Sequence, residues 1–447
     1  MNDALRAIPS VERILSSARF AALADAFGRT RVKESVSAYL DELRAARRAW
    51  SEDEATDAIA IRLRAATSST LRRVINATGV IIHTNLGRSP IDAALWSDAA
   101  NVVTGYSNLE FDLDRGERGA RDEHLAELCR SLFGCEAAIL TNNNAAGTLL
   151  LLAATAGARE GASSASREVL VSRGELVEIG GSFRVPDVIQ QGGARLREVG
   201  TTNRTRARDY AANEQTAAIL RVHRSNFDIV GFTETPSISE LIDTARAQRV
   251  PLLYDEGSGR VVDISKYGFE KKETIRELIE AGVDAIACST DKLIGATQGG
   301  LILGSEAIIE KCRKHPLMRA LRAGKESYAV IAETLRAFAT DRYEERVPIY
   351  RMLATPLDVL RERARSLGAR NIIDSRCALG GGTTPTETIA SIAIAIDGNA
   401  NEQYARFLKN DPPIVGRIVD DRFTLDMRTI PEDDLSHVSR RFEDLAR

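Results

Sequence analysis

The chain has 447 residues, which is long enough for two or three domains with cores of their own. Hydrophobic residues make up 44% of it and charged residues 28%, as in an ordinary soluble protein. The formal net charge of −3 excludes the strong positive field of a general nucleic-acid binder, so any contact with RNA has to be local.

The five cysteines are odd in number and show neither a Cys-x-x-Cys pair nor a zinc-type spacing. We therefore expect reduced thiols, a cytoplasmic location and no metal site. The N-terminus lacks the apolar core of a signal peptide. No window approaches the roughly 18 uninterrupted apolar residues of a transmembrane helix, which predicts a protein without a membrane span.

A helical N-terminal domain is predicted over residues 1–75, because apolar residues recur at helical spacing between residues 10 and 73. The first predicted helix contains Val11, Ile14, Leu15 and Ala18, and the longer second one contains Val32, Val36, Leu40, Leu43 and Trp50. The pattern of apolar residues changes after this segment, which indicates that the segment is a separate unit.

Between the two predicted helices lies a turn with three cations in five positions, namely Arg29, Arg31 and Lys33. Residues 1–75 carry 13 basic and 10 acidic side chains, so this unit is more basic than the rest of the chain. Two interpretations stay open: a packing or oligomerisation domain with a solvated charged face, or a local surface for RNA.

Beyond Arg73, short apolar runs that end in glycine, asparagine or aspartate alternate with helical stretches. This alternation predicts an α/β domain with a largely parallel sheet, over residues 76–335. Its first loop brings His83, Asn85 and Arg88 close together, and such loops usually line a site. His83 taken alone is as consistent with a structural histidine as with a catalytic one.

A strand then turns through residues 140–147 into an apolar helix, residues 148–156. A helix that starts in this way offers free backbone N–H groups and the positive end of its dipole to an anion. Asn144, Ala145 and Ala146 are therefore candidate phosphate-binding residues. A helix capped by asparagine explains the same residues equally well. The small polar segment 157–168 that follows is predicted to be a surface excursion.

The apolar strand at residues 250–255 delivers Asp255 to its C-terminal end, where open α/β sheets bind their ligands. A carboxylate there can pair with a pyridinium nitrogen and keep it protonated. Asn226 ends the preceding strand and is a candidate partner for the phenolic oxygen of such a ring. A turn or helix-cap aspartate is the alternative.

Lys292 stands between two apolar runs, residues 285–288 and 301–303, that predict neighbouring buried strands. A lysine at such a place loses hydration, so its amine can titrate near neutral pH, as Schiff-base chemistry with pyridoxal 5'-phosphate (PLP) requires. Ser289 is placed to hold the cofactor's phosphate. An isolated Ser-x-x-Lys is more often an ordinary surface lysine, and the presence of Asp255 upstream favours the cofactor.

Arg319 and Arg322 are predicted to lie three apart on one face of a helix. Together with Arg88 from the distant loop they form a candidate binding site for a tetrahedral oxyanion. A solvated helix face is the alternative.

A long helix predicted at about residues 327–342 leads to the C-terminal region. The glycine-rich residues 380–384 and the apolar run 414–418 then predict a small α+β domain. We expect this domain to take up residues 336–447 and to close over the cofactor cleft.

Several long strings occur together in this chain: IPSVERIL, FGRTRV, VINATGVIIHTNLGR, NNNAAG, SRGELVEIGGSFRVPDV, VGTTNRT, YDEGSG and TDKLIG. In this combination the chain resembles the family of bacterial selenocysteine synthases, the L-seryl-tRNA(Sec) selenium transferases, over nearly its whole length. The resemblance implies a PLP-dependent transferase of fold type I, with a mostly parallel seven-stranded sheet in its large domain.

The resemblance also implies roles for single residues. Lys292 would form the Schiff base with PLP, and Asp255 would be the partner of the pyridinium nitrogen. The phosphate of a selenium donor would be bound by Arg88, Arg319 and Arg322. The N-terminal helical domain would hold tRNA, and the assembly would be a ring-like homo-oligomer built from dimers, a decamer.

The implied reaction converts L-seryl-tRNA(Sec) to L-selenocysteinyl-tRNA(Sec) with selenophosphate, by β-elimination through a dehydroalanyl intermediate and then addition of selenium. The chain departs from the family in two places: residues 295–298 read Gly-Ala-Thr-Gln where Gly-Gly-Pro-Gln is frequent, and residues 157–168 are long.

Two alternatives remain. One is a PLP-dependent β-eliminating lyase acting on a small phosphorylated amino acid; residues 1–75 count against it, because such an enzyme has no evident need of a basic helical unit. The other is a non-catalytic RNA-binding scaffold, which the presence of both Asp255 and Lys292 disfavours.

Overall fold

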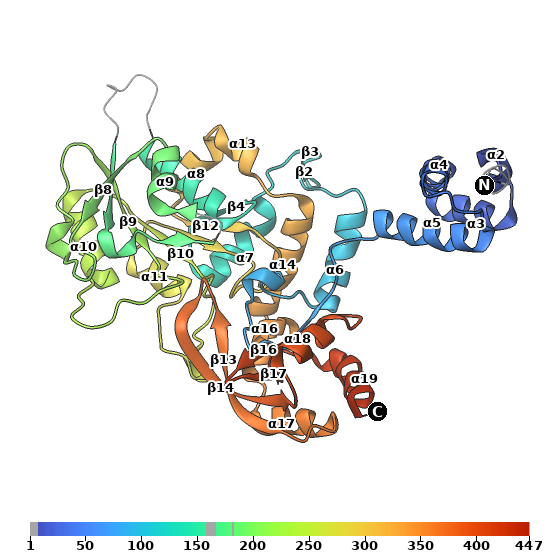
Figure 1. Ribbon diagram of the computed structural model, residues 1–447. Coiled ribbons are helices and arrows are strands. Elements are labelled where there is room, and N and C mark those ends of the chain that lie inside the picture. The colour runs from blue at the N-terminus through green and yellow to red at the C-terminus, as the bar shows by residue number, and fades with distance from the viewer. Residues whose placement is uncertain (1–7, 158–166, 181–182, 447) are drawn as a thin grey trace. The chain divides into compact units, whose positions relative to one another are not determined.

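The computed structural model describes residues 8–157, 167–180 and 183–446 (Figure 1). Contacts divide the chain into two compact units, residues 1–73 and residues 74–447. Each unit is described by itself. Most of the predicted surface excursion lies outside the described residues.

The described part of the first unit is mainly helical, as predicted, although residues 68–73 lie outside its helices and the first predicted helix is interrupted at residues 16–17. Its helices are α2 (Val11–Leu15), α3 (Ala18–Phe27), α4 (Arg29–Ala46) and α5 (Glu52–Thr67). Ser10 and Ser51 cap α2 and α5 by accepting hydrogen bonds from backbone N–H groups of the first turn. The apolar faces of the helices meet in one core, which includes Phe20, Val32, Val36, Leu40, Leu43, Ile59 and Leu63.

The turn between α3 and α4 is shorter than predicted. Gly28 alone separates the two helices, with a φ of 88° that glycine adopts without a steric penalty. Arg29, Arg31 and Lys33 therefore occupy the first turns of α4, and all three are exposed. Helix α4 presents them at its N-terminal end.

Trp50 was predicted within the second helix, and this is wrong. Helix α4 ends at Ala46, and Arg47 after it takes a left-handed conformation. The chain then turns back, so that the rings of Trp50 and Tyr39 meet edge to face with centroids 6.5 Å apart.

The second unit is built on a seven-stranded sheet in the order β4-β12-β11-β10-β9-β5-β8. Strand β12 is antiparallel to both of its neighbours, and the other strand pairs are parallel. The prediction of a mostly parallel seven-stranded sheet is therefore confirmed. The strands are β4 (Ala137–Thr141), β5 (Glu168–Ser172), β8 (Arg195–Val199), β9 (Thr216–Val222), β10 (Leu252–Gly257), β11 (Ala285–Ser289) and β12 (Gly300–Gly304).

Helices pack on both faces of this sheet, which is why its central strands read as continuous apolar runs in the sequence. One face is covered by α8 (Asn144–Ala156), α9 (Val185–Gln191) and α12 (Glu306–Lys314). The other is covered by α7 (Glu123–Phe133), α10 (Ile238–Gln248), α11 (Ile275–Ala281) and α14 (Lys325–Ala339). Shorter or peripheral elements are α6 (Ala93–Thr104), β2 (Phe111–Asp112), β3 (Glu117–Arg118), β6 (Glu178–Ile179), β7 (Phe183–Arg184), α13 (Leu317–Leu321), α15 (Tyr343–Arg346) and α16 (Pro348–Ala354).

A second, antiparallel sheet follows in the order β13-β14-β17-β16. Its strands are β13 (Ile372–Gly380), β14 (Thr384–Ile396), β16 (Arg417–Val419) and β17 (Arg422–Asp426), and it packs with α17 (Leu357–Ser366), α18 (Ala400–Leu408) and α19 (Leu435–Ala446). The start of the unit joins this layer, because β1 (Ile75–Asn76) pairs with β15 (Ile414–Val415). The two ends of the second unit thus share one core.

Three predicted helix boundaries differ from the structure. The apolar helix predicted at residues 148–156 already begins at Asn144, and the helix predicted at about residues 327–342 is α14. Helix α13 ends at Leu321, and Arg322 has an extended backbone with a ψ of 143°. Arg319 and Arg322 therefore do not share a helical face, and the prediction that they do is wrong. Across the described residues, every helix is too short or too polar to span a bilayer.

Candidate active site

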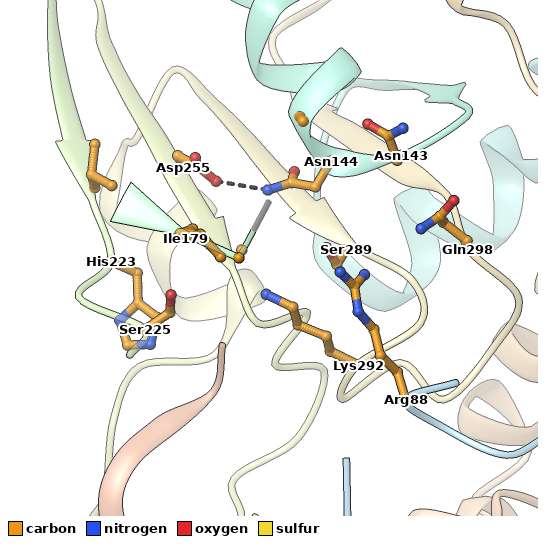
Figure 2. Close-up of a pocket in the computed structure, with 14 residues that line it drawn as sticks. Arg88, Asn143, Asn144, Ile179, His223, Ser225, Asp255, Ser289, Lys292 and Gln298 are labelled. Carbon is orange, nitrogen blue, oxygen red and sulfur yellow. Dashed lines mark hydrogen bonds between the residues drawn. The ribbon is translucent and has the colours of Figure 1, made fainter. Parts of the chain in front are cut away.

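A cavity of about 240 Å³ opens at the C-terminal ends of β9, β10 and β11 (Figure 2). This is the edge at which open α/β sheets bind their ligands. The sequence run that ends in Asp255 and the one that leads to Lys292 form adjacent parallel strands, so their ends meet at this edge. The cavity is lined by Arg88, Asn143, Asn144, Ala145, Ile179, Gly180, Val222, His223, Ser225, Asp255, Gly257, Ser289, Lys292 and Gln298.

Lys292 lies in the turn that joins β11 to β12 and is 7% exposed. Its Nζ donates a hydrogen bond to the backbone oxygen of Gly382 at 3.1 Å, and Figure 2 shows its amine end pointing into the pocket. Burial, and after it the positive charge of Arg88, lower the pKa of Lys292 below the ordinary lysine value. Its amine is therefore neutral more often than that of a surface lysine.

Asp255 is 4% exposed near the end of β10. Its Oδ1 accepts a hydrogen bond from Nδ2 of Asn144 at 2.8 Å (Figure 2). Burial raises the pKa of Asp255, while the bond from Asn144 and the charge of Lys292 act in the opposite direction. The Asn144 amide thus orients a carboxylate that has little water to solvate it.

The N-terminus of α8 forms another wall of the cavity. Asn143 is the N-cap of this helix, and its Oδ1 accepts a hydrogen bond from the backbone N–H of Ala146 at 2.8 Å. The asparagine cap and the pocket wall are thus the same structure, since Asn143, Asn144 and Ala145 all line the cavity. The first N–H groups of a helix have no partner within it, so this end suits an anion. Ser289, buried at the end of β11, lines the cavity with them.

Arg88 reaches the cavity from the loop that follows β1. Its φ of 64° is uncommon for a residue with a side chain, and its N–H bonds to the backbone oxygen of His83 at 3.0 Å. Its Nη1 pairs with Oδ2 of Asp291 at 2.7 Å, directly before Lys292 in the chain. His83 does not line the cavity; its Nδ1 accepts a bond from the backbone of Asn85 at 3.3 Å, which is a structural role.

Four residues that were predicted to bind the cofactor or the substrate anion lie outside the residues that line this cavity. Asn226 is exposed, and its Nδ2 donates to the backbone oxygen of Glu178 at 2.8 Å. Arg319 is exposed on α13, and Nη1 of Arg322 pairs with Glu110 at 3.3 Å. The fourth is Ala146, whose N–H is taken by the helix cap.

His223, Ser225 and Gln298 line the cavity although the sequence did not single them out as site residues. Nε2 of His223 lies 2.9 Å from the backbone oxygen of Thr383. His223 and Ser225 could have been found in the sequence, because the polar cluster at residues 223–226 ends a strand next to the one that carries Asp255. Gln298 gave no comparable signal.

The residues present fit PLP. Among the described residues, Oδ1 of Asn144 and Oγ of Ser225 are buried atoms without a hydrogen-bond partner, and both residues face the cavity. Such atoms suit a polar ligand. Gly257, with a φ of 64°, keeps the wall beside Asp255 free of a side chain. An amine, a carboxylate and a helix N-terminus around one cavity correspond to the aldehyde, the ring nitrogen and the phosphate of PLP.

The model of the family L-seryl-tRNA selenium transferase matches residues 74–431, and that of the selenocysteine synthase N-terminal domain matches residues 5–44. The L-seryl-tRNA(Sec) selenium transferase of Geobacter sulfurreducens is 43% identical over 98% of both chains. That of Shigella flexneri is 40% identical over 95% of this chain and 96% of the other. A solved structure of D-glucosaminate-6-phosphate ammonia-lyase has the same fold, with a TM-score of 0.62 and 22% identity over 84% of this chain and 96% of that chain. The chain belongs to the L-seryl-tRNA selenium transferase family.

Proposed function

We propose that this protein converts L-seryl-tRNA(Sec) to L-selenocysteinyl-tRNA(Sec), with PLP as its cofactor and selenophosphate as its selenium donor. The observation that carries the proposal is that Lys292 and Asp255 line one cavity at the ends of adjacent strands. Membership of the family supports it, because relatives that bear this enzyme's name match the chain over nearly its full length.

The cofactor would be held by Lys292 at its aldehyde carbon, by Asp255 at its ring nitrogen, and by Ser289 with the first residues of α8 at its phosphate. When bound, PLP supplies an electron sink for the electron pair left on the substrate Cα. Asp255 serves this chemistry by keeping the ring nitrogen protonated. Asn144 keeps the carboxylate in place through its bond to Oδ1.

Lys292 is the proposed base. Once the α-amine of the seryl group has displaced Lys292 from the cofactor, Nζ would take the proton from Cα, and the β-hydroxyl would leave with this proton as water. Selenium from the donor would then bond to Cβ while Cα takes up a proton, and water would cleave the P–Se bond and release phosphate. A neutral amine is needed to take the proton from Cα, and burial lowers the pKa of Lys292 in the required direction. The amine also needs a fixed direction, which the bond to the oxygen of Gly382 provides.

Arg88, Arg319 and Arg322 are the proposed ligands of selenophosphate, because guanidinium groups match a tetrahedral oxyanion. Arg88 already borders the cavity. Arg322 forms a β-bridge with Thr141, at the end of the strand that leads into α8, and so belongs to the same edge of the sheet.

The proposed tRNA contacts are Arg29, Arg31 and Lys33 on α4, which would meet phosphates of the RNA backbone. The N-terminal domain, the catalytic domain and the small C-terminal domain are proposed as tRNA-binding, PLP-binding and cleft-closing parts. A homo-oligomeric ring of dimers, which the resemblance to the family implies, completes the proposal.

A direct test measures selenium transfer by purified full-length protein supplied with PLP, seryl-tRNA(Sec) and selenophosphate. We expect selenocysteinyl-tRNA(Sec) as product and a change in the visible absorbance of the bound cofactor when seryl-tRNA(Sec) alone is added. The lyase alternative predicts the reverse, namely no spectral change with the tRNA and elimination from a small phosphorylated amino acid. A protein with that second behaviour would not be a selenium transferase.

A further inference from the structure

The loop that joins β13 to β14, residues 380–384, is called the strap below. It contains three consecutive glycines, and Gly380 and Gly382 have φ values of 121° and 89°. Such a sequence has little conformational preference of its own. Yet Gly382, Thr383 and Thr384 are buried, so contacts with the rest of the site must fix the strap.

One group of contacts fixes the strap to the lysine. The backbone N–H of Gly382 donates to the oxygen of Ser225 at 2.9 Å, and the oxygen of Gly382 accepts from Nζ of Lys292 at 3.1 Å. A Cβ at position 382 would lie 2.6 Å from that Nζ. The strap therefore rests directly on the amine, and a side chain at position 382 would require the amine to move as well as a strained backbone.

The other contact is made by His223. Its Nε2 lies 2.9 Å from the oxygen of Thr383, a residue with 0% exposure, and its backbone N–H donates to the oxygen of Asp255 at 2.9 Å. Because a carbonyl oxygen only accepts, Nε2 carries the proton. Burial lowers the pKa of His223, which keeps the ring neutral. One residue thus connects the strand of Asp255 to the strap.

We propose that His223 is a positioning residue that holds the strap on Lys292. Through Thr383 it keeps Gly382 where its oxygen sets the direction of the amine, and it keeps water from that amine. This inference deepens the proposed function, because it rests on Lys292 being the reactive lysine.

The test compares His223→Leu, which removes the donor, with His223→Gln, whose amide can still donate to the oxygen of Thr383. Hydrogen exchange of the backbone amides of residues 380–384 is measured in the full-length protein, both loaded with PLP and after PLP is removed. Loss of one buried hydrogen bond predicts exchange faster by about two- to tenfold in the leucine variant. The glutamine variant should return most of the protection.

A second readout follows the lysine itself. In the PLP-free protein, labelling of Lys292 by a small amine reagent, located by mass spectrometry, should be faster in His223→Leu and near the wild-type rate in His223→Gln. Neither readout depends on selenium transfer, so a failed transferase assay would leave this test intact.

His124→Leu is the matched control, since Nε2 of His124 also lies 3.2 Å from backbone oxygens, those of Asn108 and Leu109. It should leave exchange at residues 380–384 unchanged. The proposal is overturned if His223→Leu leaves the strap as protected as in the wild type, if exchange rises equally throughout the sheet, or if glutamine restores neither protection nor slow labelling.

Discussion

The charged groups of this protein fall into two regions with opposite surroundings. Lys292 and Asp255 are buried, and burial shifts the pKa of each toward its neutral form. The proposed anion-binding cations lie partly or fully in water and are already paired with carboxylates of the same chain where partners are within reach. The buried groups are thus suited to proton transfer, whereas the more exposed cations are suited to exchanging one bound anion for another.

This difference has an energetic basis. An ion pair in water contributes only about 0–1 kcal/mol, because solvent screens it. A phosphate can therefore displace Glu110 from Arg322 at small cost. The pair of Arg88 with Asp291 is held more firmly, because Asp291 is buried. Lys292 and Asp255 are buried, and each is proposed to act directly on the cofactor. Substitutions in the buried region should accordingly have much larger effects than those among the exposed cations.

The largest effect is expected for Lys292→Ala. The amine is both the proposed attachment point for PLP and the proposed base, so the variant should lose the visible absorbance of the bound cofactor and all measurable selenium transfer. Absorbance spectra and the transfer assay check this. Full turnover in the variant would remove the buried region from the chemistry altogether.

The next effect is expected for Asp255→Asn. An amide cannot keep the ring nitrogen protonated, so kcat should fall by about 10²- to 10³-fold. Asn144→Ala is the informative partner variant, because it leaves the carboxylate but removes the bond that orients it. Asn144→Ala should lower kcat less than Asp255→Asn does. An equal fall in kcat would mean that the orientation of the Asp255 side chain matters and its charge does not.

A single titration can compare the two regions. In PLP-free protein, the pH dependence of Lys292 labelling reports its pKa, which burial and then Arg88 lower and which Asp255 raises. Arg88→Gln should therefore move the midpoint to higher pH, since a nearby positive charge disfavours the ammonium form. Asp255→Asn should move it to lower pH. If the midpoint of Lys292 labelling moved in the same direction in both variants, Arg88 and Asp255 would not have opposite electrostatic effects on the lysine.

Part of this arrangement was readable in the sequence. Lys292 and Asp255 follow buried parallel strands, whose apolar runs are unmistakable and whose C-terminal ends must meet at one edge. The turn from a strand into an apolar helix was readable for a similar reason, since a helix start depends on neighbouring residues, although the helix begins at Asn144 and not at residue 148 as predicted.

Other parts could not be predicted from the sequence because they depend on distant segments. Gly382 meets Lys292 from 90 positions away, and nothing local marks the contact. Asn226 was assigned to the cofactor on local grounds, but its side chain donates to the backbone of Glu178. Arg319 and Arg322 were placed on one helix by their spacing, although α13 ends between them.

Arg88→Gln should have a moderate effect on selenium transfer. Loss of a charge-assisted hydrogen bond to an anion costs about 1.5–3 kcal/mol, so KM for selenophosphate should rise by about 10- to 100-fold. Arg88→Lys keeps the charge but loses the planar guanidinium group, so its KM for selenophosphate should lie between those of the wild type and Arg88→Gln. A fall in kcat with an unchanged KM would instead assign Arg88 to the buried region, as a group that acts on Lys292.

Substitutions on α4 are expected to have the smallest effect per residue, and this effect is on the binding of tRNA. Replacing Arg29, Arg31 and Lys33 together by glutamine should weaken binding of seryl-tRNA(Sec) and reduce the slope of log K against log salt by about one for each RNA phosphate that the variant no longer binds. The control changes Arg44, Arg47 and Arg48 at the other end of the same helix, which removes the same charge from exposed positions. If both triple variants bind the tRNA equally weakly, the tRNA responds to the net charge of the unit and not to a defined surface. If only the first binds more weakly than the wild type, the N-terminal end of α4 is the RNA-binding surface, and it behaves as the exposed region should, since added salt weakens it.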